Sequence, residues 1–147
     1  MAETRDVLNK RNSVIAIAPL AYEQGRIAGY NMTGRKRLYN GGIGMNSIDV
    51  YNLPVMTVGL TSPINDRQET RTFRKGNVYR KLVLDGNRLV GAILVGDVGY
   101  CGILTHLIRS QAGIKDIKKE LIDHGLKTGE FVSAMIKREI NRVSVYQ

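Results

Sequence analysis

The sequence predicts an α+β fold, in which an antiparallel sheet with a central hairpin has an N-terminal helix and C-terminal helices packed on it. Three observations predict it. β-Branched residues fill the middle of the chain, the turn sequence DGN at 85–87 separates two apolar runs, and helical periodicity follows. Strands followed by a run of helices indicate an α+β fold and not a doubly wound dinucleotide-binding fold.

The first predicted helix is APLAYEQGRIAGYNMTG, Ala18–Gly34. Pro19 fits the first turn, where its missing N–H costs no intrahelical hydrogen bond. Apolar residues recur from Leu20 at helical spacing, and Gly34 is a typical C-terminal stop. This helix has no His, no Cys and one Glu, so its side chains offer little chemistry.

Two strands and a hairpin are predicted next. The strands are Ile43–Tyr51 and Pro54–Leu60, and the polar segment Thr61–Phe73 is predicted to be a connection with turn residues. The hairpin lies within Asn77–Asp97, because glycine and asparagine in its DGN turn tolerate positive φ. Its second strand, Arg88–Val95, is nearly all apolar and is predicted to be buried.

Three helices are predicted after the hairpin. Apolar residues at helical spacing mark Tyr100–Gln111, Ile114–His124 and Glu130–Val143, and Gly125 is expected to end the second of these helices.

The composition of the chain excludes some classes of protein. The chain has 147 residues, enough for a domain with its own core. No apolar run approaches the roughly 20 residues of a membrane helix, and the polar first residues do not form a secretory signal. The single cysteine, Cys101, excludes an internal disulfide and favours a reducing compartment. We therefore expect a cytoplasmic protein that does not contact a membrane.

The net charge is +9, and the segments Gly34–Asn40 and Arg67–Lys81 supply most of it. Basic surfaces attract phosphate, although a solvated basic face has the same composition. One alternative function is therefore a free-standing basic module that binds phosphate or nucleic acid. Its candidate residues are Arg35, Lys36, Arg37, Arg71, Arg74 and Lys75. No helix-turn-helix, zinc-finger or RNP-type motif accompanies them, which argues against nucleic acid as a partner.

Residues with catalytic chemistry are scattered. His106 lies off the apolar face of its helix without a carboxylate at a suitable spacing, and His124 suits a helix C-terminus. Cys101 is expected to be a small buried hydrophobe, and a thiol-dependent enzyme built on it is a third, weaker alternative. Asp85 and Asp97 are isolated carboxylates. We therefore predict no catalytic residues and no metal site.

Two glycine-rich segments resemble phosphate loops only superficially. GGIG, at 41–44, has no Walker lysine and leads into a strand, so it is predicted to be a turn. GDVGYCG, at 96–102, lies between a strand and a helix, but its spacing is not that of a dinucleotide-binding loop. We predict a tight strand-to-helix connection there.

A family resemblance is carried by APLAYEQGRIAGYNMTG, YNGG, LPVMTVGL and YRKLVLDGNRLVGAILVGD. The chain resembles the C-terminal portion of the FAD-dependent pyridine nucleotide-disulfide oxidoreductases, in the branch of NADH oxidases, rubredoxin reductases and nitrite reductases. The resemblance covers about residues 2 to 110, and the tail from Gln111 matches less clearly. The most specific parts are EQGRIAGYNM and the hairpin.

The resemblance implies that this chain is a fragment that starts just after the Gly-Asp motif closing the FAD domain. Residues 1–34 would then end the FAD-binding domain, and residues 35–147 would form an α+β interface and dimerisation domain with a helical tail. The implied partners are the missing FAD and NAD domains and a second copy. FAD would be bound in the full-length parent, a flavin-dependent NAD(P)H oxidoreductase, and not by this chain alone.

The same resemblance implies a role for the first helix. In the family, the start of this helix faces the N1–C2=O edge of the flavin ring. By position, Ala18, Leu20 and Ala21 would supply the contacts as cofactor-binding residues. A helix start suits this task because free N–H groups and the helix dipole stabilise an anion.

Overall fold

The computed structural model describes residues 2–123 and residue 129. The chain divides into two compact units, residues 1–46 and residues 47–147. The functional division that the sequence predicts after residue 34 stays a prediction.

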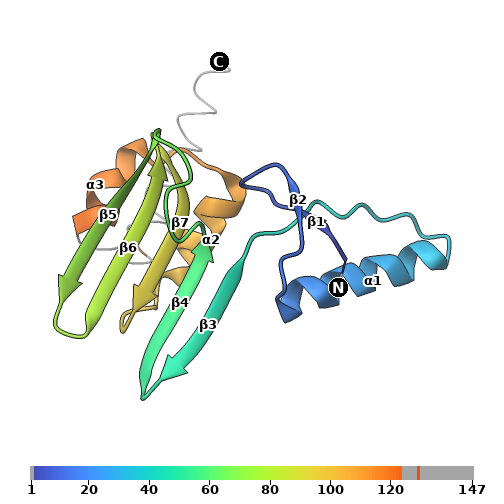
Figure 1. Cartoon of the computed structure of the whole chain (residues 1–147), viewed down its shortest axis with the longest axis horizontal. Coiled ribbons are helices and arrows are strands. Elements are labelled where there is room, and N and C mark those ends of the chain that lie inside the picture. Colours follow the sequence, from blue (N-terminus) through green and yellow to red (C-terminus); the bar gives the residue numbers. More distant parts are fainter. Residues whose placement is uncertain (1, 124–128, 130–147) are drawn as a thin grey trace. The chain divides into compact units, whose positions relative to one another are not determined.

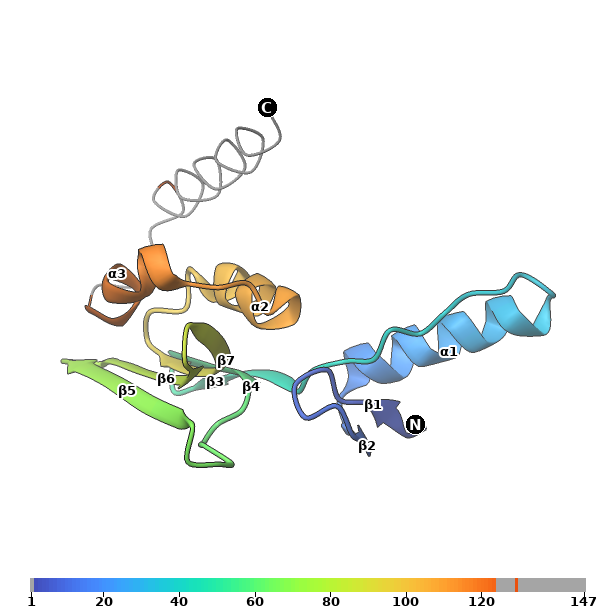
Figure 2. The same cartoon turned by 90° about the horizontal axis from the view of Figure 1, so that it is seen from above.

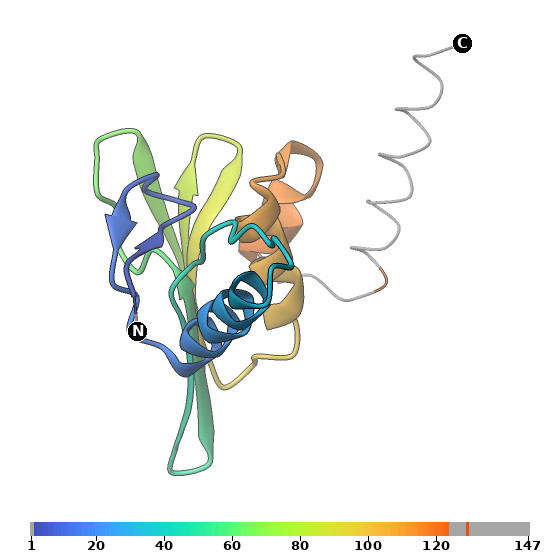
Figure 3. The same ribbon diagram turned by 90° about the vertical axis from the view of Figure 1, so that its right-hand side faces the viewer.

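The first unit contains α1 (Ala18–Met32) and a small antiparallel sheet of β1 (Thr4–Arg5) and β2 (Asn12–Ser13), as Figure 3 shows. The predicted helix is confirmed. Pro19 lies in its first turn, and Gly34, at φ 81°, follows its end. The sequence does not predict β1 and β2, because strands of two residues carry no measurable periodicity.

The second unit is built on a five-stranded sheet with the order β3-β4-β7-β6-β5 (Figure 1). The strands are β3 (Met45–Val50), β4 (Leu53–Gly59), β5 (Gln68–Lys75), β6 (Val78–Asp85) and β7 (Arg88–Val95). The β6–β7 hairpin lies inside the sheet, and β7 pairs with β4 and β6. The predicted central hairpin and the two preceding strands are therefore confirmed.

The predicted polar connection Thr61–Phe73 is wrong in its second half, where β5 begins at Gln68. β5 is an edge strand that pairs with β6 alone among the described strands. Edge strands tolerate charged side chains, which protect them from pairing with other chains. The charged residues of β5 therefore gave it the composition of a loop, while Thr70, Thr72 and Phe73 supplied its β propensity.

The connection from β4 to β5 crosses the sheet directly over β7. Gly59, at φ 68°, turns the chain, and the Leu60 N–H donates to the Val90 carbonyl at 3.0 Å. A Cβ atom on Gly91 would lie 1.7 Å from the Leu60 carbonyl oxygen. Figure 2 shows this connection on the face of the sheet opposite α2 and α3. Gly91 is therefore required by a close backbone approach.

Helices cover the other face of the sheet (Figure 2). They are α2 (Cys101–Ser110), the 3-10 turn η1 (Lys115–Ile117) and α3 (Lys118–Asp123). The first predicted C-terminal helix is confirmed. The second is shorter than predicted, because a 3-10 turn occupies its start. Its expected end at His124 and Gly125, and the third predicted helix, Glu130–Val143, lie outside the described residues.

The second unit has buried side chains on both faces of the sheet, since Leu82 and Leu84 face the helices and Val83, between them, faces the β4–β5 connection. Its fully buried side chains are aliphatic, as the apolar pattern of the hairpin and helices predicts. The largest are Val58, Leu82, Val83, Leu84, Leu89, Leu94, Leu104, Ile108, Ile114 and Leu121.

Arg80 is buried within this core, with 3% of its surface exposed. In the sequence Arg80 belongs to the basic segment Arg67–Lys81, and no pattern in that segment indicates that it is buried. Its guanidinium lies 5.2 Å from the ring centre of Phe73 and 5.0 Å from that of Tyr100. Nε donates to the Tyr100 hydroxyl, and Nη1 donates to the Leu121 carbonyl at 3.5 Å. These contacts connect β5, β6, the residue that precedes α2, and α3. Aromatic faces offset part of the cost of burying a cation.

Burial also affects Tyr100. It raises the pKa of the Tyr100 hydroxyl above its ordinary value, and the positive charge of Arg80 opposes this shift.

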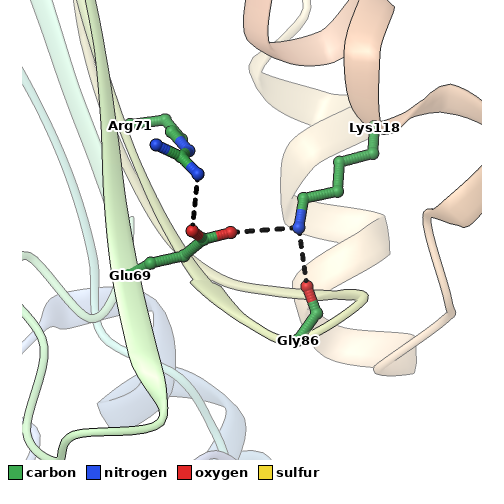
Figure 4. Close-up of polar contacts among 4 residues, drawn as sticks. All are labelled: Glu69, Arg71, Gly86 and Lys118. Atoms are coloured by element: carbon green, nitrogen blue, oxygen red, sulfur yellow. Dashed lines mark hydrogen bonds and ion pairs between the residues drawn. The ribbon is translucent and has the colours of Figure 1, made fainter.

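Glu69 connects the edge strand to α3 (Figure 4). Its Oε1 lies 3.0 Å from Lys118 Nζ and its Oε2 lies 2.7 Å from Arg71 Nη2. Lys118 also donates to the carbonyl of Gly86, in the β6–β7 turn, at 3.1 Å. The hydrogen bond from Lys118 is the main cause that lowers the pKa of the Glu69 carboxyl.

We expect Gly91→Ala to lower the free energy of unfolding by about 1–3 kcal/mol or more, because its Cβ would collide with the Leu60 backbone. Gly102→Ala is the matched control, since nothing lies within 4 Å of a Cβ on this helical glycine. It should raise stability by about 0.4–1 kcal/mol. Urea unfolding measures both, and equal effects of the two substitutions would contradict the close approach at Gly91.

Glu69→Gln is expected to lower the melting temperature near neutral pH. A carboxyl whose pKa is lowered in the folded state contributes stability above its unfolded pKa and loses it as the pH falls through the folded pKa. The difference from the wild type should therefore shrink below about pH 4, near the ordinary pKa of Glu. Glu120→Gln, on the same helix as Lys118, is the control, and thermal melts from pH 3 to 7, in steps of about one unit, test the trend.

Candidate functional site

The start of α1 presents unpaired backbone donors. The residue that precedes the helix, Ile17, is extended, and no side chain caps the first turn. The Ala21 N–H donates to the Ile17 carbonyl at 3.2 Å. Among the described residues, the N–H groups of Ala18 and Leu20 have no acceptor. The first turn contains no acidic residue, so the positive end of the helix dipole is not neutralised within it.

A close-packed glycine segment, residues 41–44, holds this helix start in place. Leu20 is buried, and a Cβ on Gly42 would lie 2.7 Å from both of its terminal methyl carbons. The Gly42 N–H donates to the Arg5 carbonyl at 3.0 Å, and the Gly42 carbonyl accepts from Val7 at 3.1 Å. Gly41, at φ 85°, also packs on the Arg5 backbone. The segment GGIG is therefore structural, but it is not the predicted turn: Gly42 forms an isolated parallel bridge with Asp6.

Two further polar side chains of the first unit are Gln24, within this helix, and Tyr39, after it. The Gln24 amide donates to the Ala2 carbonyl at 3.3 Å and accepts from the Ala2 N–H at 3.4 Å, which holds the start of the chain alongside α1. The Tyr39 hydroxyl is buried and has no hydrogen-bond partner among the described residues. The sequence indicates neither feature, because the Gln24 contact joins segments that are far apart in the sequence and the burial of Tyr39 depends on the fold.

The scattered reactive residues do not form a site. Cys101 begins α2 and is partly exposed, so the expectation that it is a buried residue is wrong. His106 is exposed on the same helix, as expected of a surface histidine. Asp97 is exposed just after β7, where Gly96, at φ 79°, turns the chain towards α2. This is the predicted strand-to-helix connection. Within residues 2–123, no group of three or more His, Cys, Asp or Glu side chains is placed to hold a metal ion.

The basic candidates lie in both units. Arg35, Lys36 and Arg37 follow α1, and Arg37 lies 5.6 Å from the ring centre of Tyr30. In β5, strand alternation places Arg71 and Lys75 on one face of the sheet and Arg74 on the other. Arg71 is also paired with Glu69. The basic residues of this strand therefore do not share one face. None of the described helices is both long enough and apolar enough to cross a membrane.

A family model and a curated protein match this chain. Residues 45–112 match the rubredoxin NAD+ reductase C-terminal domain, a segment that runs from β3 to just past α2. The chain is 30% identical over 105 residues to the nitrite reductase [NAD(P)H] of Bacillus subtilis (strain 168). This match covers 70% of the chain and 13% of the nitrite reductase, so the chain spans about an eighth of that relative's length.

Solved structures share the fold over nearly the whole chain. A NAD-dependent persulfide reductase from A. fulgidus has a TM-score of 0.69 at 19% identity, over 93% of this chain and 30% of that chain. A FAD-dependent pyridine nucleotide-disulphide oxidoreductase from Desulfovibrio vulgaris has a TM-score of 0.70 at 14% identity, over 95% and 37%. Putidaredoxin reductase, in its covalent complex with putidaredoxin, has a TM-score of 0.72 at 20% identity, over 90% and 31%.

The solved chains are about three times as long as the part that matches, and at these identities they show the common fold alone. The family model and the nitrite reductase add the evidence of sequence. Together, the comparisons all point to the C-terminal part of FAD-dependent pyridine nucleotide-disulfide oxidoreductases as what this chain is similar to.

Proposed function

We propose that this chain serves as the C-terminal part of a flavin-dependent NAD(P)H oxidoreductase. In this proposal the start of α1 completes the flavin site, and residues 35–147 form an interface and dimerisation domain. The FAD and NAD domains would be the other partners of the chain. The observation that carries the proposal is the pair of free donors, Ala18 and Leu20, at a helix start without an acidic residue.

The chemistry of this helix start suits the electron-rich edge of a flavin. The Ala18 and Leu20 N–H groups supply hydrogen-bond donors, and the helix dipole adds a partial positive charge. The Ala21 N–H is already bonded to Ile17, so of the three expected residues it contributes through the dipole. Pro19 donates nothing but fixes the first turn. The buried Tyr39 hydroxyl is a further polar group without a partner among the described residues in this unit.

The flavin and this chain would make different contributions to the reaction. A bound flavin would supply the two-electron chemistry, and this chain would stabilise charge on the flavin ring through its backbone. Leu20 on Gly42 and Gln24 on Ala2 would hold the helix start in position. This role needs no reactive side chain, which accounts for the neutral composition of α1.

A charge placed at the helix start tests this role. Residues 1–147 would be joined to the flavin- and nicotinamide-binding domains of a structurally similar enzyme, such as the one from Desulfovibrio vulgaris. Ala18→Asp should lower the two-electron flavin potential relative to Ala18→Asn by roughly 5–20 mV, because a charge at a helix terminus contributes ~0.3–1 kcal/mol. Equal potentials in two variants that bind flavin equally would contradict the assignment of α1 to the flavin.

The 147-residue chain without those domains is expected to bind no FAD. The reason is that α1 offers two backbone donors and a dipole, whereas the main binding surface for a dinucleotide would lie on the FAD domain. The measurement is the visible absorbance of the purified chain before and after incubation with FAD and desalting. Retained flavin at a one-to-one ratio would show that the binding surface lies within this chain.

The alternative function is a basic module that binds phosphate or nucleic acid, and the exposed arginines and lysines after α1 and in β5 favour it. This alternative predicts an affinity for a DNA or RNA duplex that falls steeply with salt. An absence of binding at low salt would exclude it.

A further inference from the structure

The two edges of the five-stranded sheet differ in chemistry. β5 forms one edge and β3 the other, and no described strand pairs with β3 beyond β4. β5 exposes Arg71, Arg74 and Lys75, and charged side chains of this kind protect an edge from pairing with another chain. β3 has Asp49 as its one charged residue and no proline. The β3 edge therefore lacks the usual protection.

Exposed apolar side chains lie along the β3 edge. Ile48 is 58% exposed, Val50 is 43% exposed, and Tyr51, at the turn after the strand, is 99% exposed. Apolar and aromatic residues at this level of exposure, next to unpaired backbone groups, are typical of a strand that pairs with another chain.

The turn after β3 determines which backbone groups face outward. Tyr51 and Asn52 have φ of 51° and 63°, the signature of a two-residue type I′ turn. The Asn52 N–H donates to Asp49 Oδ1 at 2.8 Å, which stabilises the turn. In such a hairpin the residues that flank the turn, Val50 and Leu53, exchange both hydrogen bonds. The N–H and C=O groups of Ser47 and Asp49 then point away from β4.

We propose that β3 pairs with β3 of a second copy, antiparallel and about a two-fold axis at Ile48. This inference rests on the dimerisation role proposed above and names its surface. Ser47 of each copy would lie opposite Asp49 of the other, and these residues would exchange backbone hydrogen bonds. The two sheets would become one continuous sheet.

The side chains of β3 are complementary to themselves in this register. Ile48 faces Ile48 of the second copy in a pair without mutual hydrogen bonds, the type that brings side chains closest. The Asp49 carboxylate faces the Ser47 hydroxyl of the second copy, so no like charges lie opposite each other. Pairing β5 with a second β5 would instead crowd Arg71, Arg74 and Lys75, which identifies β3 as the edge that self-association favours.

The position of the β3–β4 hairpin is compatible with the pairing of β3 with a second copy. The β3–β4 hairpin extends past the ends of the neighbouring strands in Figures 1 and 3. With Val50 opposite Leu53, Ile48 lies opposite Val55, which pairs with Val95, and Val95 pairs with Tyr79. An apolar row therefore runs from Tyr79 in β6, where Arg74 of β5 ends it, to Ile48, and it would continue into the second copy.

The test is the oligomeric state of the full 147-residue chain, measured by sedimentation equilibrium at several concentrations. The wild type should be in equilibrium with a dimer. Ser47→Pro removes an outward-facing N–H, and Ile48→Lys places a charge at the two-fold axis. Each should raise the dimer Kd at least about tenfold.

Matched controls exist elsewhere in the second unit. Thr72→Pro removes the equivalent outward N–H on the β5 edge, because the Lys75–Val78 pair flanks the turn at Gly76 in the same way. Ile64→Lys changes an isoleucine that is 61% exposed in a connection. Both should leave the Kd unchanged. Circular dichroism reports whether each variant is folded. If Ser47→Pro destabilises β3, the effect of Ile48→Lys on the dimer Kd still tests the proposal.

Each other outcome would overturn the inference. A dimer that resists Ser47→Pro and Ile48→Lys would show that self-association uses another surface, and the dimerisation role would stand. Open-ended assemblies that both Ser47→Pro and Thr72→Pro abolish would indicate pairing of β3 with β5. A wild type that is monomeric at every concentration would overturn the dimerisation role as well, while the flavin role of α1 would remain to be judged by the potential of the Ala18 variants.

Discussion

The crossing of the Leu60 backbone over Gly91 is the constraint on which the arrangement of the sheet depends. The chain leaves β4, passes over β7 and reaches the far edge before it returns through the hairpin. A side chain at position 91 would occupy the space of the Leu60 carbonyl. Because the chain crosses there, the hairpin fits between β4 and β5, and its second strand lies at the centre of the sheet with apolar residues towards both faces.

That strand order leaves β3 and β5 at the edges, and the two edges have different chemistry. β5 has charged residues, and Glu69 joins it to Lys118 of α3, which also bonds the central turn at Gly86. β3 has exposed aliphatic residues and a turn that directs backbone groups outward. The β5 edge is therefore bonded to the helices of its own unit. The β3 edge has the features of an edge that pairs with a second chain.

The first unit contains the helix to which we assign the proposed flavin role, although its side chains are neutral. Its start has free N–H groups at Ala18 and Leu20, and Gly42 lies directly against Leu20. Backbone donors need no particular side chain, but they need a rigid position relative to whatever they bind. Small and apolar residues around the helix start supply that rigidity, because close packing limits its movement. The proposed role in the flavin site depends on this packing more than on the identity of the residues in the helix.

The sequence by itself determined the elements whose signals are local. Pro19 and Gly34 marked the two ends of α1, the DGN turn marked the hairpin, and apolar periodicity marked α2. Tertiary structure alone decided the features that depend on distant partners. β5 looked like a loop because an edge strand needs no continuous apolar pattern, and Arg80 looked like a surface residue because the aromatic rings and carbonyl that accommodate it come from other elements. The backbone donors of α1 are a third example. The sequence predicted where the helix starts. Only the folded chain decided that the N–H of Ala21 is bonded while those of Ala18 and Leu20 are free, because this bonding depends on the path of the backbone at Ile17.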